Sequence, residues 1–145
     1  MLMLLFQCGE ERYALECRYV LTIVPLVRLI PQRQAPPYVA GLMRYFDKLV
    51  PVVDLCQLLQ GKAAAPRLST RIILVEHPLE QKRQIWGLVA EKVTETVAMQ
   101  EMGFTNGQLA VDEQGVIQQV RLDRLAAKVN PQLLLMGDDG GSSNY

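Results

Sequence analysis

The fold is decided by one stretch, residues 41–55, which reads GLMRYFDKLVPVVDL. It predicts a strand, a tight turn near Asp47 and a return strand so apolar that both of its faces should be buried. Pro51 has no backbone N–H and therefore belongs at a sheet edge or a bulge. Asp54 is placed to cap a short helix that Gly61 ends. The stretch thus predicts a buried hairpin followed by one or two helical turns.

Outward from this hairpin, short apolar segments rich in Val, Ile, Leu and Tyr dominate the chain, and helical periodicity is scarce. Such segments predict half-buried or buried strands. We expect strands near Met3–Cys8, Arg12–Glu16, Val27–Ile30, Val39–Arg44, Lys48–Val53, Arg71–Glu76, Gln84–Ala90, Val93–Met99, Leu109–Asp112 and Val116–Val120. Short helices are expected after Asp54, around Leu122 and near Cys17–Val20. The predicted fold class is therefore mainly β.

An internal repeat relates the two halves of the chain. The pattern Tyr13-Ala14-Leu15, Val20, Val24 recurs 73 residues later as Trp86-Gly87-Leu88, Val93, Val97. A second pattern recurs at an offset of 66 and then 67 residues: Tyr38, Gly41, Val50, Val53, Leu55 and Leu58 return as Phe104, Gly107, Val116, Val120, Leu122 and Leu125. Two β-subdomains built to one plan are indicated, joined by the Ala-rich linker Gly61–Pro66. Because a half of about 60 residues is marginal alone, the two should share a core. Trp86 should lie in that core where Tyr13 lies in the first half.

Composition excludes several classes of protein. Fifteen Lys and Arg balance fifteen Asp and Glu over 145 residues, with no basic stripe, which disfavours binding to nucleic acid. The opening MLMLLFQC lacks the basic residues and the length of a signal peptide or a membrane span, so no direct membrane insertion and a cytoplasmic location are expected. Cys8, Cys17 and Cys56 fit free buried thiols in a reducing cytosol better than a disulfide frame or a zinc site.

No catalytic constellation is apparent, and no metal or cofactor is predicted. His77 is expected in a surface loop without a nucleophile or an orienting acid beyond Glu76. The residues that stand out instead are Arg44, Tyr45 and Phe46 at the predicted turn. Planar cations and aromatic rings are over-represented among interface anchors. Tyr45 could equally fold back onto the end of its own β-subdomain, whereas Phe46 is the better candidate for an exposed ring.

The stretch at 41–55 resembles the signature of the CheW family, in which Gly is followed by Asn, Arg-Gly and then Pro-Val-Val/Ile-Asp-Leu. Flanking elements match in order: Tyr13-Ala14-Leu15, Val20-x-x-Ile23, Ala35-Pro36-x-Tyr38-Val39-x-Gly41, Arg71-Ile-Ile-Leu-Val75, Gly87-Leu88-Val89 with Glu91, and Gly115 to Val120-x-Leu122-Asp123. The resemblance covers roughly residues 2–129. It implies two intertwined five-stranded SH3-like barrels in one domain, 1–136, with subdomains at roughly 10–68 and 69–129 that share the first strand. A disordered tail is expected at 137–145.

The function that the resemblance implies is that of a non-catalytic adaptor. Such an adaptor pairs with the regulatory domain of a CheA-type histidine kinase and holds the hairpin tip of a methyl-accepting chemoreceptor. The family's receptor-contacting positions fall on Val20, Thr22 and Gly41. The chain departs from the family at the turn, where Asn becomes Arg44, Arg becomes Phe46 and Gly becomes Asp47. The expected protein-binding residues are Val20, Thr22, Gly41, Arg44, Tyr45, Phe46 and Asp47, and the departures favour an alternative chemosensory pathway, such as a Wsp-type surface-sensing system.

Three other interpretations stay open from the sequence. An unrelated all-β module, a duplicated SH3- or OB-like protein that contacts oligonucleotides, would need a basic–aromatic strand that the chain does not display. A small enzyme on a β-barrel would need a nucleophile–base pair. The third is a regulatory domain detached from a longer kinase; a short chain that starts directly on a strand favours a free-standing adaptor.

Overall fold

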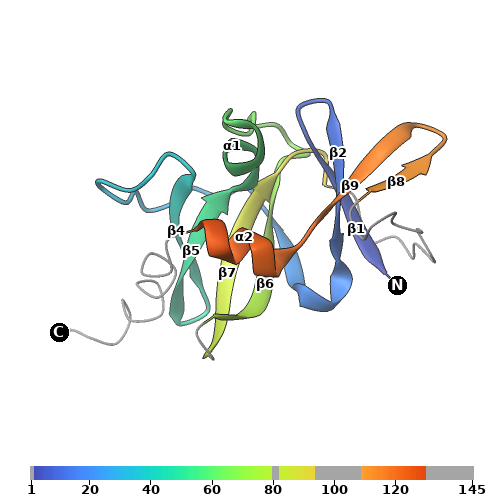
Figure 1. The fold of residues 1–145 in the computed structure, drawn as a ribbon. Helices are drawn as coiled ribbons and strands as arrows, with labels where there is room; N and C mark the ends of the chain where they lie inside the picture. The colour runs from blue at the N-terminus through green and yellow to red at the C-terminus, as the bar shows by residue number, and fades with distance from the viewer. Residues whose placement is uncertain (1, 80–81, 94–108, 130–145) are drawn as a thin grey trace.

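The computed structural model describes residues 2–79, 82–93 and 109–129. The fold is mainly β, as predicted, and Figure 1 shows two sheets with short helices beside them. The elements are β1 (Met3–Cys8), β2 (Glu11–Glu16), the 3-10 helix η1 (Cys17–Tyr19), β3 (Val20–Pro25), β4 (Val39–Tyr45), β5 (Lys48–Asp54), α1 (Leu55–Gln60), β6 (Arg71–Leu79), β7 (Lys82–Ala90), β8 (Leu109–Asp112), β9 (Gly115–Val120) and α2 (Leu122–Lys128).

Each sheet combines strands from both halves of the chain. The four-stranded sheet has the order β1-β2-β9-β8 and the five-stranded sheet the order β3-β6-β7-β5-β4. The hairpins β1–β2, β4–β5, β6–β7 and β8–β9 are antiparallel, and the halves are joined by the parallel pairs β2–β9 and β5–β7 and by the antiparallel pair β3–β6. Neither sheet can therefore form from one half alone. The division into subdomains at 10–68 and 69–129 stays a prediction, and the tail 137–145 lies outside the described residues.

The internal repeat has a counterpart in the strand register. Leu15 of β2 pairs with Val120 of β9, and Leu88 of β7 pairs with Val53 of β5. The sequence repeat relates Leu15 to Leu88 and Val53 to Val120, so these two parallel pairs are equivalent positions of the two halves. These two pairs of repeated apolar residues therefore hold one half against the other.

One large core joins the two sheets. Trp86 on β7 is fully buried, and its cluster includes Phe6 and Tyr13 from the four-stranded sheet and Leu125 from α2. The rings of Phe6 and Tyr13 stack with centroids 5.6 Å apart. The predicted core positions of Trp86 and Tyr13 are thus confirmed. Helix α1 contacts β1, β5 and β7, so it lies where the two sheets meet (Figure 1).

Several predicted elements need correction. No strand spans Val27–Ile30; the strand is β3, Val20–Pro25, and Ile30 makes only an isolated bridge to Leu42. His77 lies on β6 rather than in a loop, and its ring meets the Tyr19 ring edge-on with centroids 5.3 Å apart. Pro51 lies on the interior strand β5, where it is tolerated because the pairing with β7 begins only at Val52. The strand predicted at Val93–Met99 falls largely outside the described residues.

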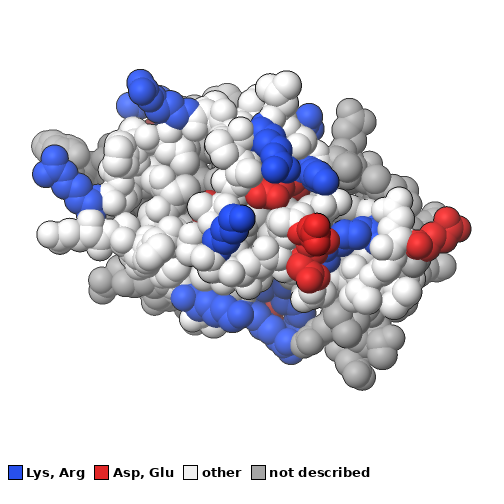
Figure 2. Space-filling view, turned by 90° about the horizontal axis from the view of Figure 1, so that it is seen from above, with Lys and Arg blue, Asp and Glu red and all other residues white. Residues whose placement is uncertain are grey.

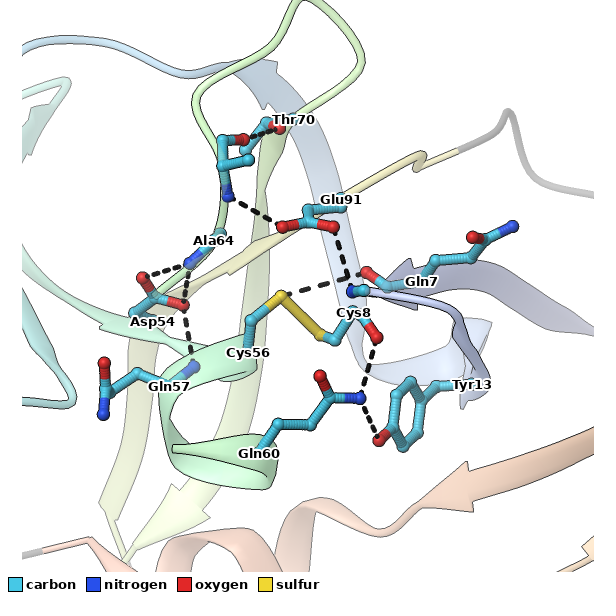
Figure 3. The surroundings of a disulfide bond; sticks show 12 residues. Gln7, Cys8, Tyr13, Asp54, Cys56, Gln57, Gln60, Ala64, Thr70 and Glu91 are labelled. Atoms are coloured by element: carbon cyan, nitrogen blue, oxygen red, sulfur yellow. Dashed lines mark hydrogen bonds between the residues drawn. A yellow bond between two sulfur atoms is a disulfide. The ribbon is translucent and has the colours of Figure 1, made fainter. Parts of the chain in front are cut away.

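The expectation of three free thiols is wrong for two of them. Cys8 at the end of β1 and Cys56 in α1 form a disulfide, with Cα atoms 5.0 Å apart (Figure 3). The two cysteines are 48 residues apart in sequence, and only the packing of α1 against β1 brings them together. Cys17 is unpaired and half-buried, and burial raises the pKa of its thiol.

Asp54 caps α1, as the sequence predicted. Its carboxylate accepts hydrogen bonds from the backbone N–H of Gln57 at 3.1 Å and of Ala64 at 3.0 Å, so it fixes both the helix start and the loop beyond Gly61. Gly61 ends the helix at φ 75°. Replacing Asp54 with alanine is expected to lower the free energy of unfolding by about 1–2 kcal/mol, because these N–H groups lose their acceptor.

Urea denaturation of Asp54→Ala beside Asp47→Ala measures this loss. Asp47 is exposed at the β4–β5 turn, and its replacement should leave stability almost unchanged. Equal midpoints for the two variants would contradict a capping role for Asp54.

Candidate protein-interaction site

The β4–β5 hairpin presents an aromatic tip. Tyr45 pairs with Lys48, so the loop consists of Phe46 and Asp47 alone. The Phe46 side chain is 81% exposed, the largest exposure of any described aromatic ring. Tyr45 is half-buried against the cluster that contains Met43, and its ring meets that of Phe46 edge-on, with centroids 4.7 Å apart and planes at 74°. Tyr45 therefore packs between the Met43 cluster and the Phe46 ring.

The backbone at this tip departs from what the sequence suggested. The residue with positive φ is Phe46, at 55°, and not Asp47, where the family's turn has its glycine. A side chain in the left-handed region costs about 1–2 kcal/mol, because Cβ crowds the following carbonyl. Glycine, which adopts a positive φ most readily, would therefore be favoured at the position of Phe46 rather than at that of Asp47. An exposed ring held in a strained conformation is typical of a residue retained for contact rather than for stability.

The charged residues of the turn are free of ion pairs within the described part of the chain. Arg44 and Asp47 are both exposed, and the ion pairs that the structure describes lie elsewhere, at Arg18–Glu16, Arg83–Glu76 and Arg121–Asp123. Figure 2 shows Lys and Arg side chains dispersed over one face, with Asp and Glu between them. The tip therefore combines an apolar ring with one cation and one carboxylate.

Val20 and Thr22 lie apart from the tip in the sheet order. Both are on β3, one edge strand of the five-stranded sheet, whereas Gly41 is on β4, the opposite edge strand. The β3–β6 register shifts between Val20 and Thr22, and the extra residue, Leu21, is 43% exposed. Leu21 was not predicted from the sequence, because alternation alone does not reveal a bulge.

Gly41 is buried, and its backbone conformation explains why it is glycine. Its φ is 144°, and an added Cβ would lie 2.6 Å from the carbonyl oxygen of Ile30 and 2.9 Å from the Leu29 Cβ. Ile30 and Leu42 exchange backbone hydrogen bonds of 2.8 and 2.9 Å, so the backbone at Ile30 is held close to Gly41. The structure thus gives Gly41 a role in packing.

The described residues give no sign of a metal site or of a membrane-spanning helix. Among residues 2–79, 82–93 and 109–129, no three His, Cys, Asp or Glu side chains gather as they would around a metal ion. None of the helices in those ranges has the length and apolar character that a bilayer crossing requires. The described surface thus offers exposed apolar and aromatic side chains on a β scaffold, the features of a protein-binding module.

Comparisons with known proteins agree with this class. The family model of the CheW-like domain matches residues 2–136. The structure resembles the scaffolding protein TtCheW from Thermoanaerobacter tengcongensis, with a TM-score of 0.69 and 21% sequence identity over 83% of this chain and 84% of that one. At this identity the likeness shows the fold. No curated protein sequence matched. The chain belongs to the CheW-like domain family, whose members are scaffold proteins of chemotaxis signalling rather than enzymes.

Proposed function

We propose that this protein is a non-catalytic cytoplasmic adaptor that couples a methyl-accepting chemoreceptor to a CheA-type histidine kinase. The observation that carries the proposal is the Phe46 ring, 81% exposed at the tip of the β4–β5 hairpin. A large apolar ring that is costly to expose and strained to hold indicates a partner that covers it. Through its receptor the adaptor would gather near the membrane without entering it.

The two partners divide the surface in this proposal. The regulatory domain of the kinase binds the tip formed by Arg44, Tyr45, Phe46 and Asp47. The hairpin tip of the receptor binds along β3 at Val20 and Thr22, where the exposed Leu21 adds apolar area, and the family resemblance adds Gly41 on the opposite edge strand β4. The receptor assignment rests on the family resemblance, since Val20 and Thr22 are half-buried and Gly41 is buried, whereas the kinase assignment rests on the exposure of the tip.

The departure from the family at Phe46 indicates an altered partner. An arginine at this position suits an acidic group, whereas a phenyl ring needs an apolar pocket because it offers no hydrogen-bond donor. A cognate kinase should therefore have lost the acidic group that a standard kinase presents. This change favours an adaptor of an alternative pathway, such as a Wsp-type system, because it discriminates against standard partners.

Replacing Phe46 with alanine is expected to weaken binding to the kinase's regulatory domain by about 1–3 kcal/mol, the range of an interface anchor. The measurement is calorimetric titration against the cognate kinase's regulatory domain and against a receptor tip fragment. Val111→Ala is the matched control, since Val111 is 75% exposed on β8, away from the tip, and its loss should leave both affinities unchanged.

Phe46→Gly separates contact from stability. Glycine removes the ring and relieves the positive φ, so this variant should unfold at equal or higher denaturant concentration than wild type while binding as weakly as Phe46→Ala. The double variant Phe46→Arg, Asp47→Gly should gain affinity for a standard kinase. If Phe46→Ala binds both partners like wild type, the tip is not a contact site.

A further inference from the structure

The two sheets meet at a junction built around Cys8 and Cys56. Gln7 and Glu91 exchange backbone hydrogen bonds of 2.8 and 2.9 Å, which joins β1 to the end of β7. The Gln60 side chain donates to the Cys8 carbonyl oxygen at 2.7 Å and to the Tyr13 hydroxyl at 3.1 Å. Figure 3 shows the disulfide in the middle of these contacts, so its state bears directly on how firmly α1 holds β1.

The buried Glu91 side chain completes the junction. Its two carboxylate oxygens accept from the backbone N–H of Gly9 at 3.0 Å and of Ala65 at 2.7 Å. It thereby ties the β1–β2 turn to the loop that follows α1. Both oxygens are engaged, so this carboxylate is occupied within the fold and is poorly placed to bind a ligand.

A hollow of about 330 Å³ opens beside the disulfide. Both cysteines are buried, Cys8 fully and Cys56 with 2% exposed, and of the two only Cys56 lines the hollow. Lys62, Arg67 and Lys92 lie around the hollow with the exposed Glu10 and the engaged Glu91, an excess of one positive charge. A small molecule in this hollow would approach the disulfide from the Cys56 side, and the surrounding charge favours an anion.

We propose that Cys8–Cys56 is a reversible thiol–disulfide exchange site for a small anionic thiol. The incoming thiolate attacks the Cys56 sulfur, the bond to Cys8 breaks, and Cys8 leaves as a thiolate that takes up a proton. A second thiolate then attacks the outer sulfur of the mixed disulfide and releases Cys56. The protein disulfide is reduced by two electrons, and two small thiols are oxidised to their disulfide; the reverse steps restore the bond.

One contact in the structure and one general property of cytosolic disulfides favour a reversible bond over a permanent one. The Cys56 sulfur lies 3.9 Å from the Gln7 carbonyl oxygen, so the thiol formed on reduction has an acceptor in place (Figure 3). Cytosolic disulfides are commonly transient and redox-sensing; this step alone rests on the cytoplasmic location in the proposed function. Cys17 is the internal reference, because its raised pKa leaves less thiolate to react.

The consequence is a redox-dependent junction. The bond closes a loop between cysteines 48 residues apart, which restricts the unfolded chain and holds α1 on β1. Oxidation should raise the melting temperature by roughly 10 °C relative to the dithiol form, from the loop-closure entropy and a domain of this size.

The test incubates the full chain in glutathione buffers of graded redox ratio, alkylates free thiols and maps Cys8, Cys17 and Cys56 by mass spectrometry. Cys8 and Cys56 should become linked together as glutathione disulfide increases and should both be alkylated in excess glutathione. Cys17 should be alkylated to the same extent at every glutathione ratio. In Cys8→Ser, which cannot close the bond, Cys56 should carry one glutathionyl group.

The preference for an anionic thiol is tested by comparing two rates of reduction of the Cys8–Cys56 disulfide. The rate with glutathione is divided by the rate with cysteamine, a cationic thiol. Lys62→Glu should lower this ratio several-fold, whereas Arg124→Glu, on α2 away from the hollow, should not change it. Failure of Cys8 and Cys56 to link in excess glutathione disulfide, or to separate in excess glutathione, would overturn the exchange site. An unchanged ratio in Lys62→Glu would overturn its preference for anions. Neither readout uses the kinase or the receptor, so the proposed function stands or fails separately.

Discussion

Replacing Trp86 with alanine is expected to lower the free energy of unfolding by about 3–5 kcal/mol. The ring is fully buried in the core cluster that joins the two sheets. Its removal forfeits a large apolar burial and leaves a cavity, because strands from both halves surround the site and cannot close on it independently. No other single side chain of the described core has a larger volume to lose.

Urea unfolding followed by circular dichroism measures this effect, since Trp86 is the chain's only tryptophan and its fluorescence disappears with the variant. Trp86→Phe is the matched control. The indole Nε1–H is buried and has no hydrogen-bond partner among the described residues, so phenylalanine removes an unsatisfied donor as well as some volume. It should cost far less than alanine. A loss below about 1 kcal/mol for Trp86→Ala would contradict the burial of this ring.

Gly41→Ala is expected to lower the free energy of unfolding by roughly 3 kcal/mol, the sum of backbone strain and overpacking. The φ of 144° is disfavoured for any side chain, and the added Cβ would lie 2.6 Å from the Ile30 carbonyl oxygen. That oxygen accepts from the Leu42 N–H at 2.9 Å, so it cannot withdraw without breaking a backbone hydrogen bond.

Gly115→Ala separates the two causes. Gly115 has a similar φ of 120°, but an added Cβ there meets nothing within 4 Å. It should therefore show the strain without the clash and lose about half as much stability. Equal losses in the two variants, measured by urea unfolding, would show that the contact with Ile30 is not responsible. Because Gly41→Ala is expected to lower stability, its receptor binding has to be compared with that of wild type at the same concentration of folded protein.

The sequence alone determined the features that depend on neighbouring residues. The hairpin at 41–55, the cap at Asp54 and the helix end at Gly61 follow from turn and capping preferences that act within a few residues. The mainly β class followed from many short apolar runs, and the repeat identified several residues of the shared core, among them Tyr13, Trp86 and Leu125. Phe46 was selected as an exposed ring because it interrupts an otherwise buried hairpin at its turn.

Tertiary structure decided what depends on distant residues. The parallel pairs β2–β9 and β5–β7 join segments far apart in sequence, and no local pattern specifies which strands will meet. The strand at Val20–Pro25 forms because β6 supplies its partner, and Cys8 reaches Cys56 because α1 packs on β1. The positive φ at Phe46 is likewise imposed by the two-residue loop between paired strands. Local preference fixed which residues turn, extend or cap, whereas long-range packing fixed which of them touch.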